Sequence, residues 1–217
     1  SPMENNEIWN IVELDGRIYF QSFSAWFSYD GKMVRAFRNR QQQPLYFYNQ
    51  NGHIYTQMID EGFYEFDGKE FHHLFPRSKV NDDNVVALLP DGNNSFLMVT
   101  ENNGLFRYTG DITPWKTDID AELKKQRVNR AVMTNDSIFM IGTVLNGIYA
   151  IDRKGHCLWH FNLDNRLDNN TVLGLFCDKD NNVWAALDDG IAYIHHNSPV
   201  MLLTLPTMKP SWVWCTT

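Results

Sequence analysis

The sequence predicts an all-β protein, a β-propeller of about five four-stranded antiparallel blades. Three observations predict it: short apolar runs bounded by turn residues fill most of the chain, a glycine-led strand recurs at near-constant spacing, and several runs are apolar on consecutive positions. Strands that are apolar on both sides must be buried on both faces, so each small sheet must stack between neighbours. Radial stacking of such sheets is the propeller architecture.

The glycine-led strand sets the repeat. It occurs as GFYEF, GLFRY, GIYAI and GIAYI, beginning at Gly62, Gly104, Gly147 and Gly190, and an earlier copy, AWFSY, has Ala25 in place of the glycine. The steps between these five positions are 37, 42, 43 and 43 residues. A fixed period of roughly 20 to 50 residues is typical of repeat folds. The spacing therefore predicts five copies of one supersecondary unit.

Each copy carries a predicted hairpin turn upstream of the glycine-led strand and a more polar run downstream of it. The turns are Asp15-Gly16, Asn51-Gly52, Asp91-Gly92, Asn135-Asp136 and Asp180-Asn181. Asn, Asp and Gly tolerate the positive φ angles that tight hairpins require. The downstream runs, such as GKEFHHLF and GHCLWHF, have the mixed polarity of an outer strand that partly faces water.

These elements place the blades along the single predicted domain, residues 1–217. The expected ranges are 5–40, 41–80, 81–125, 126–168 and 169–205, with a tail at 206–217. One helical turn is predicted between units, at DAELKKQ in 120–126. Propellers close on themselves, so five blades indicate either a five-bladed ring or part of a larger propeller. The tail either begins a sixth blade or pairs with the first.

Composition excludes some functions. The formal net charge of -7 argues against a nucleic-acid surface, which needs an excess of Lys and Arg on one face. No run approaches the roughly 18 apolar residues of a membrane helix. No basic region followed by an apolar run opens the chain, so an export signal is expected to be removed or never present. Cys157, Cys177 and Cys215 form no CxxC pair, and the first two, inside apolar runs, are expected to be small buried hydrophobes.

No catalytic, metal-binding or cofactor-binding residue is predicted, and an enzyme is not expected. The sequence has no sialidase-type Asp box, no phosphate-binding glycine loop and no Gly-x-Ser-x-Gly elbow. The pairs His72-His73 and His195-His196 cannot chelate one metal ion, because adjacent strand residues point to opposite faces. The pairs Asp82-Asp83 and Asp188-Asp189 lack the pattern of a calcium loop, which favours ordinary turn chemistry.

Tryptophans are the candidate ligand contacts, because a flat ring can cover the apolar face of a sugar. Three that lie inside strands are expected to pack between blades: Trp26, Trp159 and Trp184. Trp9 and Trp115, nearer blade edges, are the candidates for exposed ligand-binding residues. Trp212 and Trp214, in the tail, are further candidates for exposure.

The segment LDNNTVLGLFCDKDNNVWAALDDGIAYIHHNSPV, residues 167–200, resembles the two-component regulator propeller repeat. The matching positions are Asn170, Val172, Leu175, Asp178, Asn182, Trp184, Leu187, Gly190 and Ile191, with Asn197-Ser198-Pro199 closing the blade. The third unit is similar at Asn84, Val85, Leu88, Gly104 and Leu105, but has Phe96 or Leu97 in place of the tryptophan. The first two units keep only the turn and the glycine-led strand.

This resemblance implies the periplasmic sensor region of a hybrid two-component regulator from Bacteroidetes. In that family two propellers commonly precede a three-tyrosine β-sandwich, a membrane helix and a kinase or DNA-binding output, so the resemblance implies a fragment or a truncated relative. Family members commonly respond to oligosaccharides, which makes an oligosaccharide the implied ligand, with no cofactor. The implied partners are the downstream sandwich and signalling domains and a second copy of the chain.

One alternative remains. The segment NGIYAIDRKGHCLWHF resembles the repeat of quinoprotein-like propellers through Ala150, Asp152, Gly155 and Trp159. It is one residue shorter than that pattern and occurs once, so it ranks second. It implies a non-enzymatic protein-interaction scaffold of the cell envelope.

Overall fold

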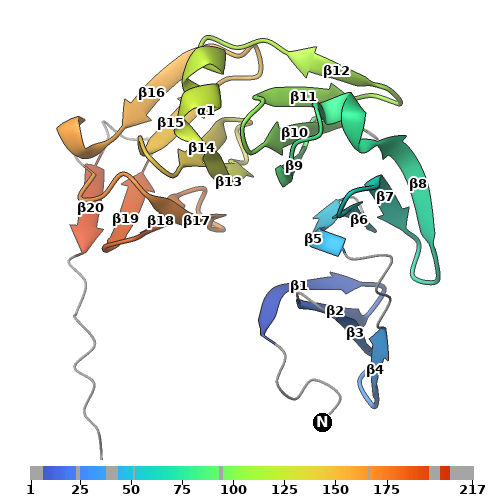
Figure 1. The fold of residues 1–217 in the computed structure, drawn as a ribbon. Helices are drawn as coiled ribbons and strands as arrows, with labels where there is room; N and C mark the ends of the chain where they lie inside the picture. Colours follow the sequence, from blue (N-terminus) through green and yellow to red (C-terminus); the bar gives the residue numbers. More distant parts are fainter. Residues whose placement is uncertain are drawn as a thin grey trace, which may run out of the picture. The chain divides into compact units, whose positions relative to one another are not determined.

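The structure is a computed structural model that describes residues 7–22, 25–37, 44–50, 52–92, 95–165, 167–195 and 201–205. The described residues form twenty strands, one α-helix and two short 3-10 turns (Figure 1). The chain divides into two compact units, residues 1–116 and 117–217. No helix among the described residues is long and apolar enough to cross a membrane.

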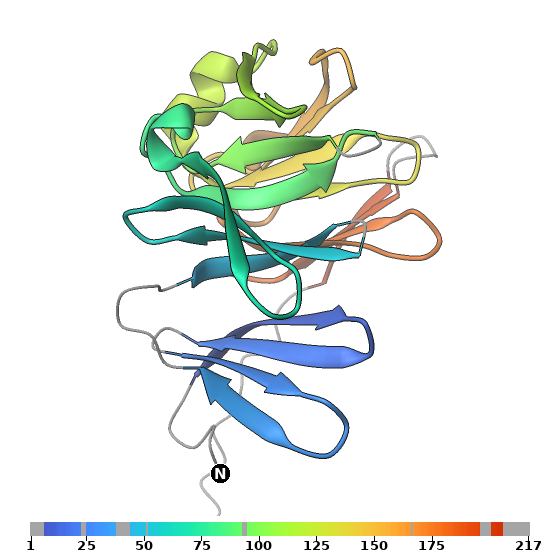
Figure 2. The same cartoon turned by 90° about the vertical axis from the view of Figure 1, so that its right-hand side faces the viewer.

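The first unit holds three four-stranded antiparallel sheets, in which consecutive strands lie side by side. Blade 1 comprises β1 (Ile8–Leu14), β2 (Arg17–Ser22), β3 (Trp26–Tyr29) and β4 (Val34–Phe37), and Figure 2 shows these four strands in blue. Blade 2 comprises β5 (Pro44–Gln50), β6 (His53–Met58), β7 (Gly62–Phe66) and β8 (Phe71–Pro76). The 3-10 turn η1 (Arg77–Val80) leads to blade 3, which comprises β9 (Val85–Pro90), β10 (Phe96–Thr100), β11 (Leu105–Tyr108) and β12 (Ile112–Trp115).

The second unit begins with the helix and holds two sheets of the same kind. Helix α1 (Asp120–Gln126) precedes blade 4, which comprises β13 (Val128–Met133), β14 (Phe139–Thr143), β15 (Ile148–Ile151) and β16 (Cys157–Phe161). The 3-10 turn η2 (Leu163–Asn165) leads to blade 5, which comprises β17 (Val172–Cys177), β18 (Val183–Leu187), β19 (Ile191–His195) and β20 (Met201–Leu205).

The predicted fold class, an all-β propeller of five four-stranded antiparallel blades, is confirmed. The predicted helical turn is also confirmed as α1. The first hairpin shows why the turn residues matter: Asp15 and Gly16 have φ angles of 51° and 72°, and they connect the paired residues Leu14 and Arg17. Positive φ at both central residues matches the twist of the two strands. The tail 206–217 lies outside the described residues.

All five blades contain a β-bulge, which the sequence analysis did not predict. Near its start, the first strand of each blade shifts register against the end of the second strand, which is the last two residues in blades 1, 3, 4 and 5 and the last three in blade 2. The unpaired residues in blades 1, 3, 4 and 5 are Trp9, Val86, Asn129 and Leu173. A bulge adds one residue to a strand and re-aims its side chain. Trp9 and Leu173, each 46% exposed, therefore both lie at this repeated irregularity.

The residues that carry the family resemblance in blade 5 form a turn clamp. The Asp178 carboxylate accepts the backbone N–H groups of Asp180 (3.0 Å) and Asn182 (2.8 Å) and the indole N–H of Trp184 (2.9 Å). The hydrogen bonds from Asn182 and then Trp184 hold the pKa of Asp178 below its ordinary value. The Asp-x-x-x-Asn-x-Trp spacing is thus explained by closure of the hairpin between β17 and β18.

The interfaces between adjacent blades, here called seams, contain the core. Trp26 is buried in the seam between blades 1 and 2, and Trp159 packs at the edge of the seam between blades 4 and 5, as expected. Trp184 does not pack between any two of the five described blades, contrary to expectation: it is 39% exposed, because it lies on the face of blade 5 opposite to blade 4. The expected burial is also wrong for Cys157, which is exposed because it begins the outer strand β16; Cys177 is half-buried.

Candidate functional site

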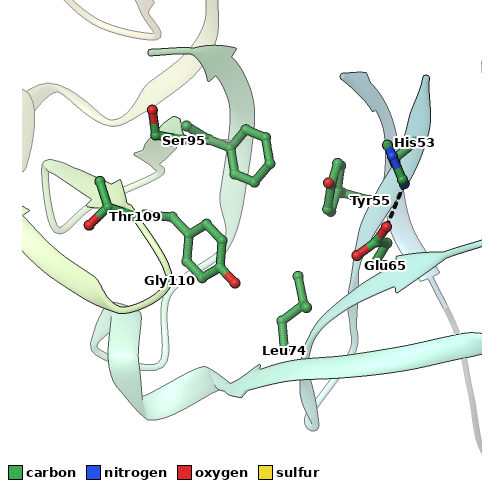
Figure 3. A pocket seen from close by; sticks show the side chains of 9 residues that line it. His53, Tyr55, Glu65, Leu74, Ser95, Thr109 and Gly110 are labelled. Atoms are coloured by element: carbon green, nitrogen blue, oxygen red, sulfur yellow. Dashed lines mark ion pairs between the residues drawn. The ribbon is translucent and has the colours of Figure 1, made fainter. Parts of the chain in front are cut away.

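A pocket of about 630 Å³ opens in the seam between blades 2 and 3, inside the first unit (Figure 3). Blade 2 contributes His53, Tyr55, Glu65 and Leu74, and blade 3 contributes Ser95, Phe96, Tyr108, Thr109 and Gly110. In Figure 3 the labelled side chains of blade 2 face Ser95 and Thr109 of blade 3 across the opening. A concave site lined by aromatic rings with a few polar groups is the usual form of a small-ligand site.

Strand register explains why these side chains meet. Tyr55 of β6 lies directly opposite Glu65 of β7, and Phe96 of β10 lies directly opposite Tyr108 of β11. His53 shares the face of Tyr55, because alternate residues of a strand point the same way. The rings of Tyr55 and Phe96 lie 4.8 Å apart across the seam, and the rings of Phe96 and Tyr108 stack at 5.5 Å. Each blade therefore supplies one cross-strand pair to the pocket.

The Tyr55 hydroxyl is the most unusual group in the pocket. Tyr55 is only 7% exposed, yet among the described residues its hydroxyl has no hydrogen-bond partner. Burial, followed by the neighbouring Glu65 and Tyr108, raises the pKa of Tyr55 to about 12. The ring is buried, but the hydroxyl oxygen is not among the fully buried polar atoms that lack a partner, so it is accessible from the pocket. It is therefore a hydrogen-bonding group that the pocket offers to a ligand.

A histidine–carboxylate pair borders the same pocket. His53 Nδ1 lies 2.5 Å from Glu65 Oε1, and the two side chains are 52% and 27% exposed. No Lys or Arg occurs among the lining residues. The pocket therefore offers hydroxyls, one carboxylate and apolar ring surface, and it disfavours an anionic ligand because no cation lines it.

The two predicted ligand-binding residues lie elsewhere. Trp9 is 46% exposed, as expected, but it does not line the pocket. Trp115 was expected to be exposed and is only 9% exposed. The guanidinium of Arg107 lies 4.3 Å above the Trp115 ring, and Asp91 holds that guanidinium at 2.8 Å, so the ring is covered. Trp212 and Trp214 lie outside the described residues.

Asp83, expected in ordinary turn chemistry, has a structural role. Its buried carboxylate accepts the backbone N–H groups of Asn84 (2.8 Å), Asn102 (2.7 Å) and Asn103 (2.8 Å), and the side-chain amides of Asn102 and Asn103. Burial acts to raise the pKa of Asp83, but these hydrogen bonds outweigh it and the pKa is lowered. With its oxygens occupied by protein donors, Asp83 is not a calcium ligand in this structure.

Adjacent histidines of β8 point apart, as predicted. His72 Nε2 lies 3.0 Å from Asp67 Oδ2, whereas the His73 ring packs edge-on against Tyr64 at 5.1 Å. Glu70 joins His72 and Asp67 in an exposed cluster whose ligand atoms lie within 4.8 Å of one another. Asp67 also accepts hydrogen bonds from the backbone N–H groups of Lys69 and Glu70 and so stabilises the turn between β7 and β8. We interpret the cluster as a hairpin contact.

Sequence reasoning missed the pocket residues. Tyr55 and Tyr108 are far apart in the chain and belong to different blades, so neither looks special by itself. Nor do the two runs after the hairpin turns share a pattern: Ile54 separates His53 from Tyr55, whereas Ser95 and Phe96 are adjacent and β10 begins only at Phe96. Aligning the repeats by their strand ends places Tyr55 with Leu97, so no repeated motif marks the pocket.

Comparisons with known proteins show the fold. No protein-family model matches the chain, and no curated protein matches it in sequence. Among solved structures, the virginiamycin B lyase of Staphylococcus aureus is similar with a TM-score of 0.72 and 15% identity, over 96% of this chain and 72% of that chain.

Extracellular domains of two B. thetaiotaomicron proteins are also similar. The putative hybrid two-component system BT3049 gives a TM-score of 0.75 at 12% identity, over 92% of this chain and 28% of that chain. The putative one-component system BT4673 gives 0.68 at 18% identity, over 86% and 27%. The chain thus spans little more than a quarter of each of these extracellular domains. It is a β-propeller whose structural neighbours include both extracellular domains of putative one- and two-component systems and an enzyme.

Proposed function

We propose that this propeller is an extracytoplasmic ligand-recognition module of a two-component-type signalling regulator and that it binds an oligosaccharide between blades 2 and 3. The observation that carries the proposal is the Tyr55 hydroxyl, which has no protein partner among the described residues and is accessible from a pocket lined by aromatic rings. The family resemblance of the fifth blade and the similarity to extracellular domains of a putative one-component and a putative hybrid two-component system support it.

An uncharged sugar fits the chemistry of this pocket. Sugar hydroxyls both donate and accept, so they can pair with the Tyr55 and Tyr108 hydroxyls, with Ser95 and Thr109, and with the Glu65 carboxylate. The half-buried Tyr108 ring and Leu74 offer apolar surface for the carbon-bound hydrogens of a pyranose. Because Glu65 lines the pocket and no Lys or Arg does, a uronic acid is expected to bind more weakly than its neutral counterpart.

Signalling by such a module needs differential binding rather than chemistry. A ligand between two blades contacts both, so it favours the arrangement of the seam in which both sets of contacts form. That preference shifts the equilibrium of whatever output the module is coupled to. The proposed partners are a downstream sandwich and signalling domains and a second copy of the chain, and the proposed location is the periplasm.

The test is calorimetric titration of the purified chain with a panel of neutral and acidic oligosaccharides, repeated with Tyr55→Phe. We expect the variant to weaken binding about tenfold, close to 1.4 kcal/mol, without loss of stability, because its hydroxyl has no protein partner to lose. Tyr64→Phe is the matched control: its hydroxyl donates to Glu61 Oε2 at 2.7 Å and does not line the pocket.

Two results would contradict the proposal: no binding of any oligosaccharide, or equal binding by wild type and Tyr55→Phe. A stable protein partner together with the absence of any glycan-induced thermal shift would favour the scaffold alternative instead. Consumption of a bound glycan during the titration would assign the site to an enzyme, with the pair His53 and Glu65 as the first residues to replace.

A further inference from the structure

Blade 5 buries one face and leaves the other apolar and exposed. Its buried side chains alternate along the strands and pack against blade 4: Val172, Val183, Ala185, Leu187, Ala192 and Ile194. The opposite face carries Phe176, Trp184 and Ile191, which are 64%, 39% and 44% exposed, and the half-buried Tyr193. We call these four residues the open face. Contiguous exposed apolar surface of this kind marks an interaction site more often than singly scattered residues do.

Register makes the open face a continuous strip. Phe176 of β17 pairs with Trp184 of β18, and Trp184 pairs with Tyr193 of β19, so three aromatic residues form one row across the sheet. The rings of Trp184 and Tyr193 lie 4.6 Å apart. Ile191 continues the strip on the same face, since alternate residues of a strand share a side.

The corresponding row of blade 4 is a blade-to-blade contact. Val132 of β13 pairs with Met140 of β14, and Met140 pairs with Ala150 of β15. This row occupies the same position in the repeat as the row of blade 5, because Met140 and Trp184 each lie three residues before the end of the second strand of their blade. Met140 and Ala150 are fully buried beneath blade 5. The open face therefore occupies the position that, one repeat earlier, receives the next blade.

The side chains also define what fits there. Met140 of blade 4 meets small residues of blade 5, Val172, Ala185 and Ala192 among them. A row of Phe, Trp and Tyr is larger still and needs small side chains opposite it, since interiors pack without overlap. A second copy of the chain presenting its own open face would place ring against ring. Shape therefore favours a blade face over a self-paired dimer.

We propose that the open face of blade 5 packs against a further blade of the same repeat, a four-stranded antiparallel sheet with small aliphatic side chains at alternate positions. This proposal does not depend on ligand binding between blades 2 and 3. It assigns Phe176, Trp184 and Ile191 to an inter-blade seam, continuous in kind with the seam between blades 4 and 5.

The test is hydroxyl-radical footprinting of the unmodified 217-residue chain and of the complete natural polypeptide that contains it. We expect Phe176 and Trp184 to be oxidised about fivefold or more slowly in the complete polypeptide, because packed interfaces exclude water as interiors do. Leu158, 43% exposed on the outer strand β16, is the internal control and should react at the same rate in both proteins.

Equal oxidation of Phe176 and Trp184 in the two proteins would overturn the proposal. Protection already present in the 217-residue chain, growing with concentration and accompanied by a dimer in sedimentation, would also overturn it and assign the face to a second copy. No variant is needed, so a failure to fold cannot imitate either result.

Discussion

The seam between blades 2 and 3 and the seam between blades 4 and 5 are built from different residues. The first is rich in aromatic side chains: Tyr55, Phe63, Phe75, Phe96 and Phe106. The second is mostly aliphatic and small: Ile148, Ala150, Val172, Val183, Ala185 and Ala192. The pocket of about 630 Å³ lies in the aromatic seam.

The two seams also differ at one position of the repeat, the residue before the end of the second strand. Gln57, the residue before the end of β6, donates to the Asp83 carbonyl and accepts from the Val85 N–H, both at 2.8 Å. The same position of β14 is Gly142, where an added Cβ would lie 2.5 Å from Val172 Cγ1. A long polar side chain thus joins one pair of blades, and the absence of a side chain lets the other pair touch. The lesson is that one repeat accommodates different seams by changing single positions.

The largest effect is expected at Asp83, at the start of blade 3. Asp83→Ala should lower the free energy of unfolding by about 3–5 kcal/mol, because it removes the buried carboxylate that accepts the part-buried N–H groups of Asn84, Asn102 and Asn103. Urea unfolding measures this. Asp180→Ala, in an exposed turn of blade 5, is the control and should change stability little.

The pH dependence of that effect has a definite sign. The folded-state pKa of Asp83 is lowered, so its contribution is present above the ordinary value of 3.8 and is lost as pH falls through the folded value. The stability difference between wild type and Asp83→Ala should therefore shrink in acid. A difference that stays constant from neutral pH to pH 2 would contradict the assigned role of the carboxylate.

A single methyl group at Gly142 should destabilise the seam between blades 4 and 5. Gly142→Ala should cost about 1–3 kcal/mol, because its Cβ would overlap Val172 across the seam. Gly174→Ala is the matched control in the facing strand, where the new Cβ lies at an ordinary 3.5 Å from the Ala186 Cβ. We expect the control to be neutral or slightly stabilising. Thermal unfolding of both variants decides whether Gly142 sets this contact.

Gln57 and Gln21, which bridge blades 2 and 3 and blades 1 and 2, should differ in how much they stabilise the fold. Gln57→Met leaves the buried Val85 N–H and Asp83 carbonyl unpaired and should cost about 2 kcal/mol. Gln21, the same position of blade 1, donates to the Pro44 and Leu45 carbonyls, but its Oε1 is buried without a partner among the described residues. Gln21→Met should therefore cost less. Denaturant unfolding of both variants checks the order, and the reverse order would show that acceptor pairing by Gln57 is unimportant.

The smallest effect is expected at the hairpin between β7 and β8, away from both seams. The hydrogen bond with Asp67 raises the pKa of His72 above its ordinary 6.5, and the same bond lowers the pKa of Asp67 below its ordinary 3.8. The stabilisation that His72 contributes is fully present below pH 6.5 and is lost as the pH rises through its folded-state pKa. The stabilisation that Asp67 contributes is present above pH 3.8 and is lost as the pH falls through its folded-state pKa. The pair is thus strongest between these two ordinary values.

An NMR titration of His72 tests the pair directly. Asp67→Asn should return the pKa of His72 toward its ordinary value, whereas Asp60→Asn, at an exposed carboxylate that pairs with Arg77, should leave it in place. An unchanged pKa in Asp67→Asn would assign the shift to other neighbours, namely Glu70 and Glu65.

The candidate site was less predictable than the fold. Trp9 and Trp115 were chosen from their place near blade edges, but exposure depends on what covers a ring. Arg107 covers Trp115 from the neighbouring strand β11, and a bulge turns Trp9 outward. The pocket itself combines side chains from two blades, and nothing in either blade alone marks them.

The sequence by itself determined the blades. Alternating and continuous apolar runs, hairpin residues that accept positive φ, and a glycine-led strand at near-constant spacing all act within about 40 residues, so local physics specifies each four-stranded sheet. Only the tertiary structure decided how the seams differ: where Gln57 joins strands, where Gly142 lets them touch, and where the Tyr55 hydroxyl faces a pocket without a protein partner. These features depend on contacts between residues of different repeats. The repeat pattern in the sequence does not specify which side chains of neighbouring blades come into contact.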